Sequence, residues 1–224
     1  MQRLTLPGLT LTVALSLGAL MSAAASAVVP AQMLPTTEEV TFKGTSGGGT
    51  LTTLGGTTIA CESATGEGSV AAGAKLGPFH QDLKGCKSAG ITCTGLAEAS
   101  GVILVLGETH LVVDTESPAL GAGLLLLANP VHLSCSIILI EVKGEELCLV
   151  KPVSTKTTHF ETVCEESSAG SGDPKETKYW NENGVEVNIG TGGLLVSTNH
   201  GAFQGATRAA TALGTSNKEI TIDA

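Results

Sequence analysis

The chain has 224 residues, of which 42% are hydrophobic and 15% are charged, and this balance excludes an intrinsically disordered protein. A formal net charge of -9 disfavours binding to nucleic acid and to anionic membrane surfaces, because both require clusters of Lys and Arg. The aromatic residues are few (Phe 4, Trp 1, Tyr 1), so we expect a core of Leu, Val and Ile side chains.

Residues 1–27 are typical of a secretory signal peptide. Arg3 supplies a positive charge, an apolar run follows from Leu9 to Leu20, and Ala25-Ser26-Ala27 offers the small residues that signal peptidase requires. The alternative, an uncleaved membrane anchor, is disfavoured because the apolar run is short for a bilayer span. We therefore expect cleavage after Ala27 and a secreted protein, located in the cell envelope or the extracellular space.

A second uncharged run, residues 117–140, is long enough to cross a bilayer. Asn129-Pro130 lies at its centre, and this pair predicts a turn between two buried strands rather than a spanning helix. We expect no stable membrane span after the signal peptide is removed.

The cysteines all lie beyond the predicted cleavage site, and their number, 6, is even. They are Cys61, Cys86, Cys93, Cys135, Cys148 and Cys164. In an oxidising compartment this number predicts three disulfides, although the sequence alone does not determine the pairing. Proximity favours Cys86 with Cys93, and the pairs Cys148–Cys164 and Cys61–Cys135 would complete a set. The alternative is a zinc site, which is disfavoured because no C-x-x-C motif is present; we expect no metal and no cofactor.

The predicted β domain covers residues 39–224, after an extended lead-in at residues 28–38. Short apolar or alternating segments separated by Gly, Asn or Pro predict strands through its first half. These segments are Val40–Phe42, Leu51–Leu54, Thr57–Cys61, Gly68–Ala72, Ile91–Thr94, Val102–Leu106 and His110–Asp114.

Further along the chain, alternation is plainest in Val131–Leu139 and recurs in Thr158–Cys164, where it places Cys135 and Cys164 on the apolar faces. Asn183-Gly184 predicts a tight hairpin turn after Trp180.

For two segments in the second half of the chain, the sequence does not decide the secondary structure or the boundary between sub-sheets. Residues 202–213 have apolar spacing that fits a helix, but their glycines favour a strand equally. Residues 165–174 form the best candidate loop between two sub-sheets. The sum of these patterns predicts an all-β fold, a disulfide-stabilised antiparallel sandwich or barrel of many short strands.

Several short motifs resemble a group of secreted cysteine-containing β-proteins of Thermoleophilia-type soil actinobacteria. The motifs are Lys84-Gly85-Cys86, Ile91-Thr92-Cys93, Gly107-Glu108-Thr109-His110-Leu111, Val131-His132-Leu133-Ser134-Cys135, Cys148-Leu149-Val150-Lys151-Pro152, Thr157-Thr158-His159-Phe160, Thr177-Lys178-Tyr179-Trp180-Asn181-Glu182 and Gly201-Ala202-Phe203. The resemblance covers nearly the whole chain beyond residue 27. It implies export and a β fold, and it implies no activity, because that group has no known function.

Candidate catalytic residues are few. Ser46 lies in Gly44-Thr45-Ser46-Gly47-Gly48, which matches the G-x-S-x-G pattern of a hydrolase nucleophile, but a strand follows it where that motif requires a helix. Glu108 and His110 share a strand face and could form an acid–base pair, although solvated side chains are the simpler interpretation. A secreted hydrolase is therefore a disfavoured alternative, and we expect a protein that is not an enzyme.

Candidate binding residues lie near the predicted hairpin. Tyr179 and Trp180 are adjacent, so at most one of them is expected on the surface, where it could stack on a sugar or anchor a partner. Oxygen ligands for calcium are available nearby but lack the order of a calcium-binding loop. They are Glu165, Glu166, Asp173, Asn181 and Asn183.

We expect an exported, non-enzymatic β-protein that acts by surface contact with an envelope or extracellular protein or polysaccharide. The alternative is a carbohydrate- or ligand-binding module that uses Trp180 or Tyr179.

Overall fold

The computed structural model describes residues 32–34, 37–114, 122–164, 178–181, 183, 185–188 and 194–223. The predicted signal peptide and the predicted boundary loop at residues 165–174 lie outside this set. In the part of the chain that the structure describes, no helix has the length and apolar character needed to cross a membrane.

The described residues form an all-β fold, as the alternating patterns predict, in a single antiparallel sheet. Its strands are β1 (Gln32–Leu34), β2 (Val40–Ser46), β3 (Gly49–Thr53), β4 (Thr58–Cys61), β5 (Ser63–Val70), β6 (Leu76–Lys84), β7 (Lys87–Ser88), β8 (Ile91–Gly95), β9 (Val102–Asp114), β10 (Ala122–Cys135), β11 (Ile138–Lys151), β12 (Thr157–Cys164), β13 (Lys178–Trp180), β14 (Glu186–Asn188), β15 (Leu194–Thr198) and β16 (Gln204–Asp223).

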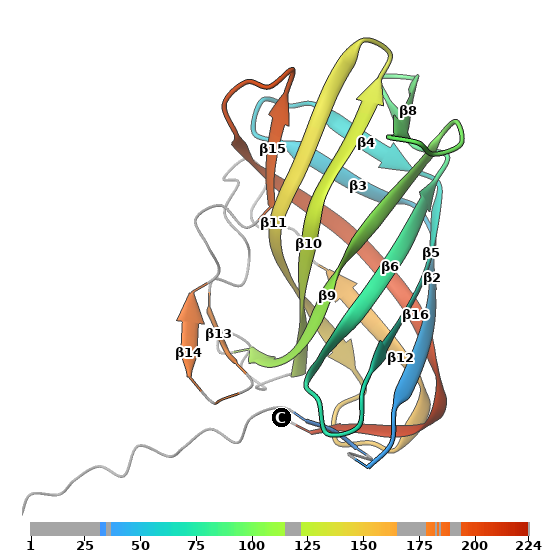
Figure 1. The fold of residues 1–224 in the computed structure, drawn as a ribbon, viewed down its shortest axis with the longest axis vertical. Helices are drawn as coiled ribbons and strands as arrows, with labels where there is room; N and C mark the ends of the chain where they lie inside the picture. The colour runs from blue at the N-terminus through green and yellow to red at the C-terminus, as the bar shows by residue number, and fades with distance from the viewer. Residues whose placement is uncertain are drawn as a thin grey trace, which may run out of the picture.

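The strand pairings return to their starting point. They run from β9 through β6, β5, β2, β16, β12, β11 and β10, and β10 pairs with β9 again. Toward the β10–β11 hairpin, β3, β4, β7, β8 and β15 extend the same sheet by pairing with the far ends of β16, β10 and β11 (Figure 1). The long strands therefore enclose an interior into which every second side chain points.

The interior holds two main clusters of buried side chains. The cluster toward the β10–β11 hairpin contains Ile59, Cys86, Cys93, Ile103, Val131, Leu133, Cys135, Ile140, Val142, Val196 and Ala206. The cluster at the opposite end contains Val40, Leu111, Val113, Val150, Ile220 and Ile222. Aliphatic side chains dominate both clusters, as the low aromatic content predicts.

Glycines let two aromatic rings pack inside the sheet. Phe42 and Phe160 meet edge to face, with ring centroids 6.3 Å apart. Phe42 lies opposite Gly68, where an added Cβ would come 2.6 Å from the ring and 2.7 Å from the carbonyl oxygen of Pro78. Gly68 therefore has no side chain because the ring of Phe42 and the neighbouring backbone occupy that space.

Gly68→Ala is expected to lower the free energy of unfolding by about 1–3 kcal/mol, since the methyl group overpacks a site closed by a ring and a backbone carbonyl. Urea denaturation measures the effect. Gly47→Ala is the matched control, because a Cβ at residue 47 meets nothing within 4 Å. Equal stabilities of the two variants would contradict this account of Gly68.

Four cysteines lie side by side on neighbouring strands, and this arrangement corrects the predicted pairing. The observed disulfides are Cys61–Cys86, Cys93–Cys135 and Cys148–Cys164, so the prediction is right for the last and wrong for Cys86–Cys93 and Cys61–Cys135. Cys86 and Cys93 flank the β7–β8 hairpin, but β4 places Cys61 beside Cys86 and β10 places Cys135 beside Cys93. A bond between the two central cysteines would leave Cys61 and Cys135 at the ends of the row.

Two other local predictions need correction. Val131–Leu139 is not one strand, because a turn at Ser136-Ile137 separates β10 from β11 and leaves Ile137 91% exposed. Asn129-Pro130 lies inside β10, where the pairing register with β11 shifts, and does not form a turn between strands. The first error arises because Ile137 and Leu139 continue the apolar spacing of β10, although the two-residue turn moves the inward positions to Ile140 and Val142. The second arises because a Pro that signals a turn can also occupy a bulge.

The structure describes residues 202–213, one of the two segments for which the sequence did not decide the structure. Residues 202–213 contribute to β16, so the strand interpretation is right; partners on both sides of the segment outweigh its weak helical spacing. The predicted hairpin forms between β13 and β14, but its loop runs from Asn181 to Val185, wider than a two-residue turn. The Asn181 side chain accepts hydrogen bonds from the backbone N–H groups of Asn183 and Val185, which closes this loop. Within the predicted lead-in, β1 pairs with the end of β16.

Candidate functional site

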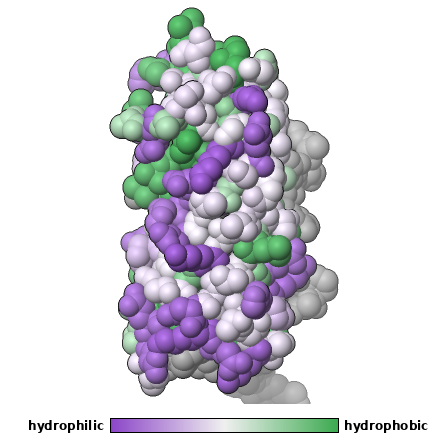
Figure 2. Space-filling model, turned by 90° about the vertical axis from the view of Figure 1, so that its right-hand side faces the viewer, coloured by the Kyte–Doolittle hydropathy of each residue, from purple (hydrophilic) through white to green (hydrophobic). Residues whose placement is uncertain are grey.

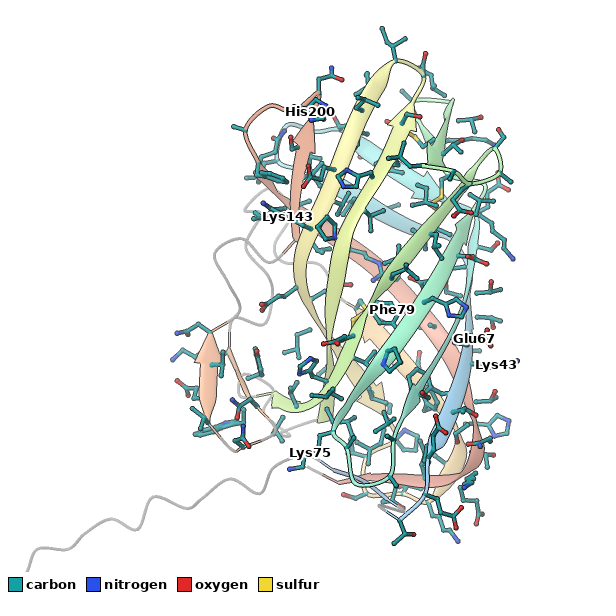
Figure 3. All side chains as sticks on the ribbon, viewed as in Figure 1. Lys43, Glu67, Lys75, Phe79, Lys143 and His200 are labelled. Carbon is teal, nitrogen blue, oxygen red and sulfur yellow. A yellow bond between two sulfur atoms is a disulfide. The ribbon has the colours of Figure 1, made fainter. Side chains whose placement is uncertain are left out.

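The interior is hollow between the two buried clusters. An apolar cavity of about 110 Å³ lies toward the β10–β11 hairpin and is lined mainly by aliphatic side chains. A second cavity of about 100 Å³ adjoins it and shares Ser46, Phe79, Gln81, Arg208 and Ala210 with it. Figure 3 shows Phe79 midway along the molecule, at the level where the two cavities meet.

Small residues explain why this region is not filled. The inward positions of β2 and β5 include Gly44, Ser46, Ala64 and Gly66, and those of β16 include Ala210. Side chains of this size leave space that Leu or Ile would occupy. The exposed Gly47 also lines the apolar cavity, which therefore reaches the surface at the turn between β2 and β3.

A buried ion pair crosses the interior at this level. Arg208 of β16 donates from Nη1 to Glu146 Oε2 of β11 at 2.5 Å and from Nη2 to Gln81 Oε1 of β6 at 3.3 Å. The Glu146 side chain is 10% exposed and that of Arg208 is 21% exposed. Along β11, Glu146 lies between Val142 of one cluster and Val150 of the other, so the pair is surrounded by apolar side chains on both sides.

The electrostatics of the pair are asymmetric. Burial raises the pKa of the Glu146 carboxyl, and the charge and hydrogen bond of Arg208 oppose part of that rise. A guanidinium does not lose its proton in proteins, so Arg208 stays charged in either case. Among the described residues, Arg208 has Glu146 and Gln81 as its hydrogen-bond acceptors, and a guanidinium has five N–H groups. Further N–H groups therefore remain for a molecule in the cavity.

The carboxylate of Glu146 also lies near sulfur atoms. One potential ligand atom from each of Glu146, Cys148 and Cys164 falls within 4.8 Å of the others. The two cysteines form a disulfide, however, and a metal requires thiolate ligands. The residues do not fit a metal while that bond is intact.

The predicted binding residues lie away from this cavity. Tyr179 is 8% exposed and packs with Val112 and Leu147. Trp180 is half-buried against the cluster that contains Val113, with which it pairs in register. Burial of the Tyr179 ring leaves Trp180 as the candidate for contact with a ligand, and that role stays a prediction.

The predicted catalytic residues do not form a nucleophile–base pair in the described part of the chain. Ser46 Oγ donates to the carbonyl of Gly47 at 3.2 Å. His110 lies 3.7 Å from Glu108, so these two residues share a face as predicted. The contacts of His80 and His159 are with Glu67 and Thr158, and none of these histidines bonds to Ser46. Of the predicted calcium ligands, Asn181 and Asn183 lie together in the β13–β14 loop, and Glu165, Glu166 and Asp173 lie outside the described residues.

The outer surface of the strands around the cavity is polar. On β2, β5 and β6, Glu67 lies 3.4 Å from Lys43 and 3.2 Å from His80 (Figure 3). Hydrophilic side chains are spread over much of this face of the molecule (Figure 2). Exposed apolar side chains interrupt this polar surface, among them Leu106 (46%) of β9 and Leu213 (66%) of β16.

The sequence interpretation missed Arg208, Glu146 and Gln81. One signal was available: Arg208 is the only arginine of the chain besides Arg3, and the remaining basic residues are lysines. Arginine is the basic residue best suited to a buried ion pair, so a single arginine among small residues marks an interior position.

No protein-family model, curated protein or solved structure matches the chain. The resemblance to secreted proteins of soil actinobacteria therefore stays a prediction. Three disulfides indicate that the protein folds in an oxidising environment, such as the extracellular space or a periplasm.

Proposed function

We propose that this protein is an exported, non-enzymatic binding protein that holds a small, largely apolar molecule in the interior of its sheet. The observation that carries this proposal is the apolar cavity of about 110 Å³ with a charged pair at its boundary. Ligand sites in proteins combine an apolar lining with a few polar groups that orient the ligand, and this cavity has both. Export is supported by the three disulfides and by the predicted signal peptide.

The cavity supports a role as a container rather than a catalytic site. Its charged residues contact each other, and the hydroxyl group of Ser46, one of its lining residues, donates to a backbone carbonyl. Gly47 at the surface offers access for a ligand between β2 and β3. A molecule bound here would be shielded from water by the strands that enclose the interior.

Ala210→Leu is expected to weaken the binding of fluorobenzene, an uncharged apolar probe, by at least about tenfold. Ala210 lines both cavities, so a larger side chain there occupies the ligand's space. Titration followed by ¹⁹F NMR of the probe measures the affinity of the wild type and the variant.

Ala209→Leu is the matched control for this experiment. Residue 209 adjoins Ala210 in β16, so its side chain points to the opposite face of the sheet, and the variant should bind the probe as the wild type does. Absence of probe binding by the wild type, or equal affinity of the two variants, would contradict the proposed function.

Contact with a partner through the surface is the second candidate. Large apolar side chains are exposed near the β10–β11 hairpin, among them Ile91 (47%), Ile137 (91%), Ile138 (41%) and Leu139 (44%). Exposed apolar groups of this kind favour an interaction site. They do not specify the chemistry of a partner, whereas the cavity and its ion pair do specify that of a ligand.

A further inference from the structure

The charged pair at the cavity restricts the chemistry of the ligand, and this inference rests on the proposed function. We propose that the ligand is a neutral ring or short hydrocarbon with one hydroxyl group, and that this hydroxyl binds between Glu146 and Arg208. Phenol and small cyclic alcohols represent the class.

Charge balance argues for a neutral ligand. Arg208 and Glu146 neutralise each other in an apolar setting, with their side chains 21% and 10% exposed. An added carboxylate or ammonium group would leave one unpaired charge in the interior, which is strongly unfavourable. A neutral molecule keeps the site balanced.

Hydrogen-bonding capacity argues for a hydroxyl group. Arg208 offers N–H donors beyond those bound by Glu146 and Gln81, and the Glu146 carboxylate offers lone pairs beyond the one that Arg208 occupies. A hydroxyl group both donates and accepts, so it can donate a hydrogen bond to Glu146 and accept one from an N–H group of Arg208. A ketone or an ether could satisfy only Arg208, and a hydrocarbon neither.

The size and lining of the cavity limit the rest of the ligand. A cavity of about 150 Å³ lined by Leu, Ile and Phe side chains is known to bind benzene, so the two adjoining cavities of about 110 Å³ and 100 Å³ together suit a ligand of roughly six to nine non-hydrogen atoms. Much of the rest of the lining is hydrocarbon, contributed by residues such as Leu51, Leu83, Val105 and Leu194. The body of the ligand is therefore apolar.

Titration calorimetry with four probes of similar size tests the inference at pH 7: phenol, toluene, benzoate and benzylammonium. Phenol is expected to bind at least about tenfold more tightly than toluene, the factor that a net hydrogen bond to a charged group provides. Benzoate and benzylammonium are expected to bind more weakly than phenol. Benzoate or benzylammonium as the tightest ligand, or equal binding of phenol and toluene, would overturn the inference.

The variant E146L/R208M provides a second measurement. It removes both charges together, so it should retain toluene binding and lose the preference for phenol. If the variant does not fold, the order of the four probes on the wild-type protein decides the inference alone.

The outcomes separate this inference from the proposed function. Toluene binding without a preference for phenol would refute the hydroxyl site and leave a binding protein for apolar molecules. Failure of both toluene and phenol to bind would refute the proposed function itself.

Discussion

Glu146→Leu is expected to lower the free energy of unfolding by about 3 kcal/mol, the lower end of the range for buried pairs, since it leaves the guanidinium of Arg208, 21% exposed, without a counter-charge. Arg208→Met should have a smaller effect, because the Glu146 carboxyl, whose pKa burial already raises, can take up a proton and become neutral. The combined variant E146L/R208M should regain much of the lost stability, because it replaces the pair with apolar side chains.

Urea denaturation of the wild type, both single variants and the combined variant forms a double-mutant cycle that isolates the coupling of the two residues. Glu67→Leu is a control, since Glu67 forms its ion pairs with Lys43 and His80 on the solvated outer face. Exposed pairs contribute little to stability, so this change should have a small effect. A loss for Glu146→Leu no larger than that for Glu67→Leu would contradict the description of the interior pair.

The ion pair also restricts which arrangement of strands the chain can adopt. Glu146 of β11, Arg208 of β16 and the Gln81 acceptor of β6 are joined by contacts that span 62 and 127 residues of the chain. A different strand register at any of the three strands would bury one of these groups without its partner. The pair therefore favours this one arrangement of strands, and the apolar side chains around it supply most of the stability.

Alternation of apolar and polar residues was sufficient to predict the all-β fold, because it depends only on neighbours in the chain. It also placed Cys135 and Cys164 on the buried face, where both are found. Alternation does not specify which strand lies beside which. Cys86 and Cys93 illustrate the limit: they are neighbours in space as predicted, yet each bonds to a cysteine on its other side.

The candidate site could not be predicted for the same reason. The meeting of Gln81, Glu146 and Arg208 depends on the order in which the distant strands β6, β11 and β16 pair, and that order cannot be seen in the sequence. The segment around Arg208 adds a second difficulty, since its small side chains carry no strong period of either helix or strand. The cavity follows from those small residues only once the opposite walls are known.

Removal of two disulfides is expected to cause the other large loss of stability. The variant C86A/C93A removes one cysteine from each of two bonds, Cys61–Cys86 and Cys93–Cys135, whose partners are separated by 25 and 42 residues. Loop-closure entropy assigns these bonds about 3.5 and 4 kcal/mol, so the variant should lose about 7 kcal/mol. This loss is comparable with the whole stability of many domains. C93A/C135A removes a single bond and should lose only about 4 kcal/mol.

Thiol titration of the denatured proteins distinguishes the observed pairing from the pairing that sequence proximity suggests. C86A/C93A should contain two free thiols, Cys61 and Cys135, because these residues lie at opposite ends of the row of four cysteines. C93A/C135A should contain none. If Cys86 were bonded to Cys93 and Cys61 to Cys135, the results would be reversed. C86A/C93A would show no free thiol, and C93A/C135A would show two, Cys61 and Cys86. If C86A/C93A does not fold, peptide mapping of the non-reduced wild-type protein decides the pairing, because its bonds form in the folded chain.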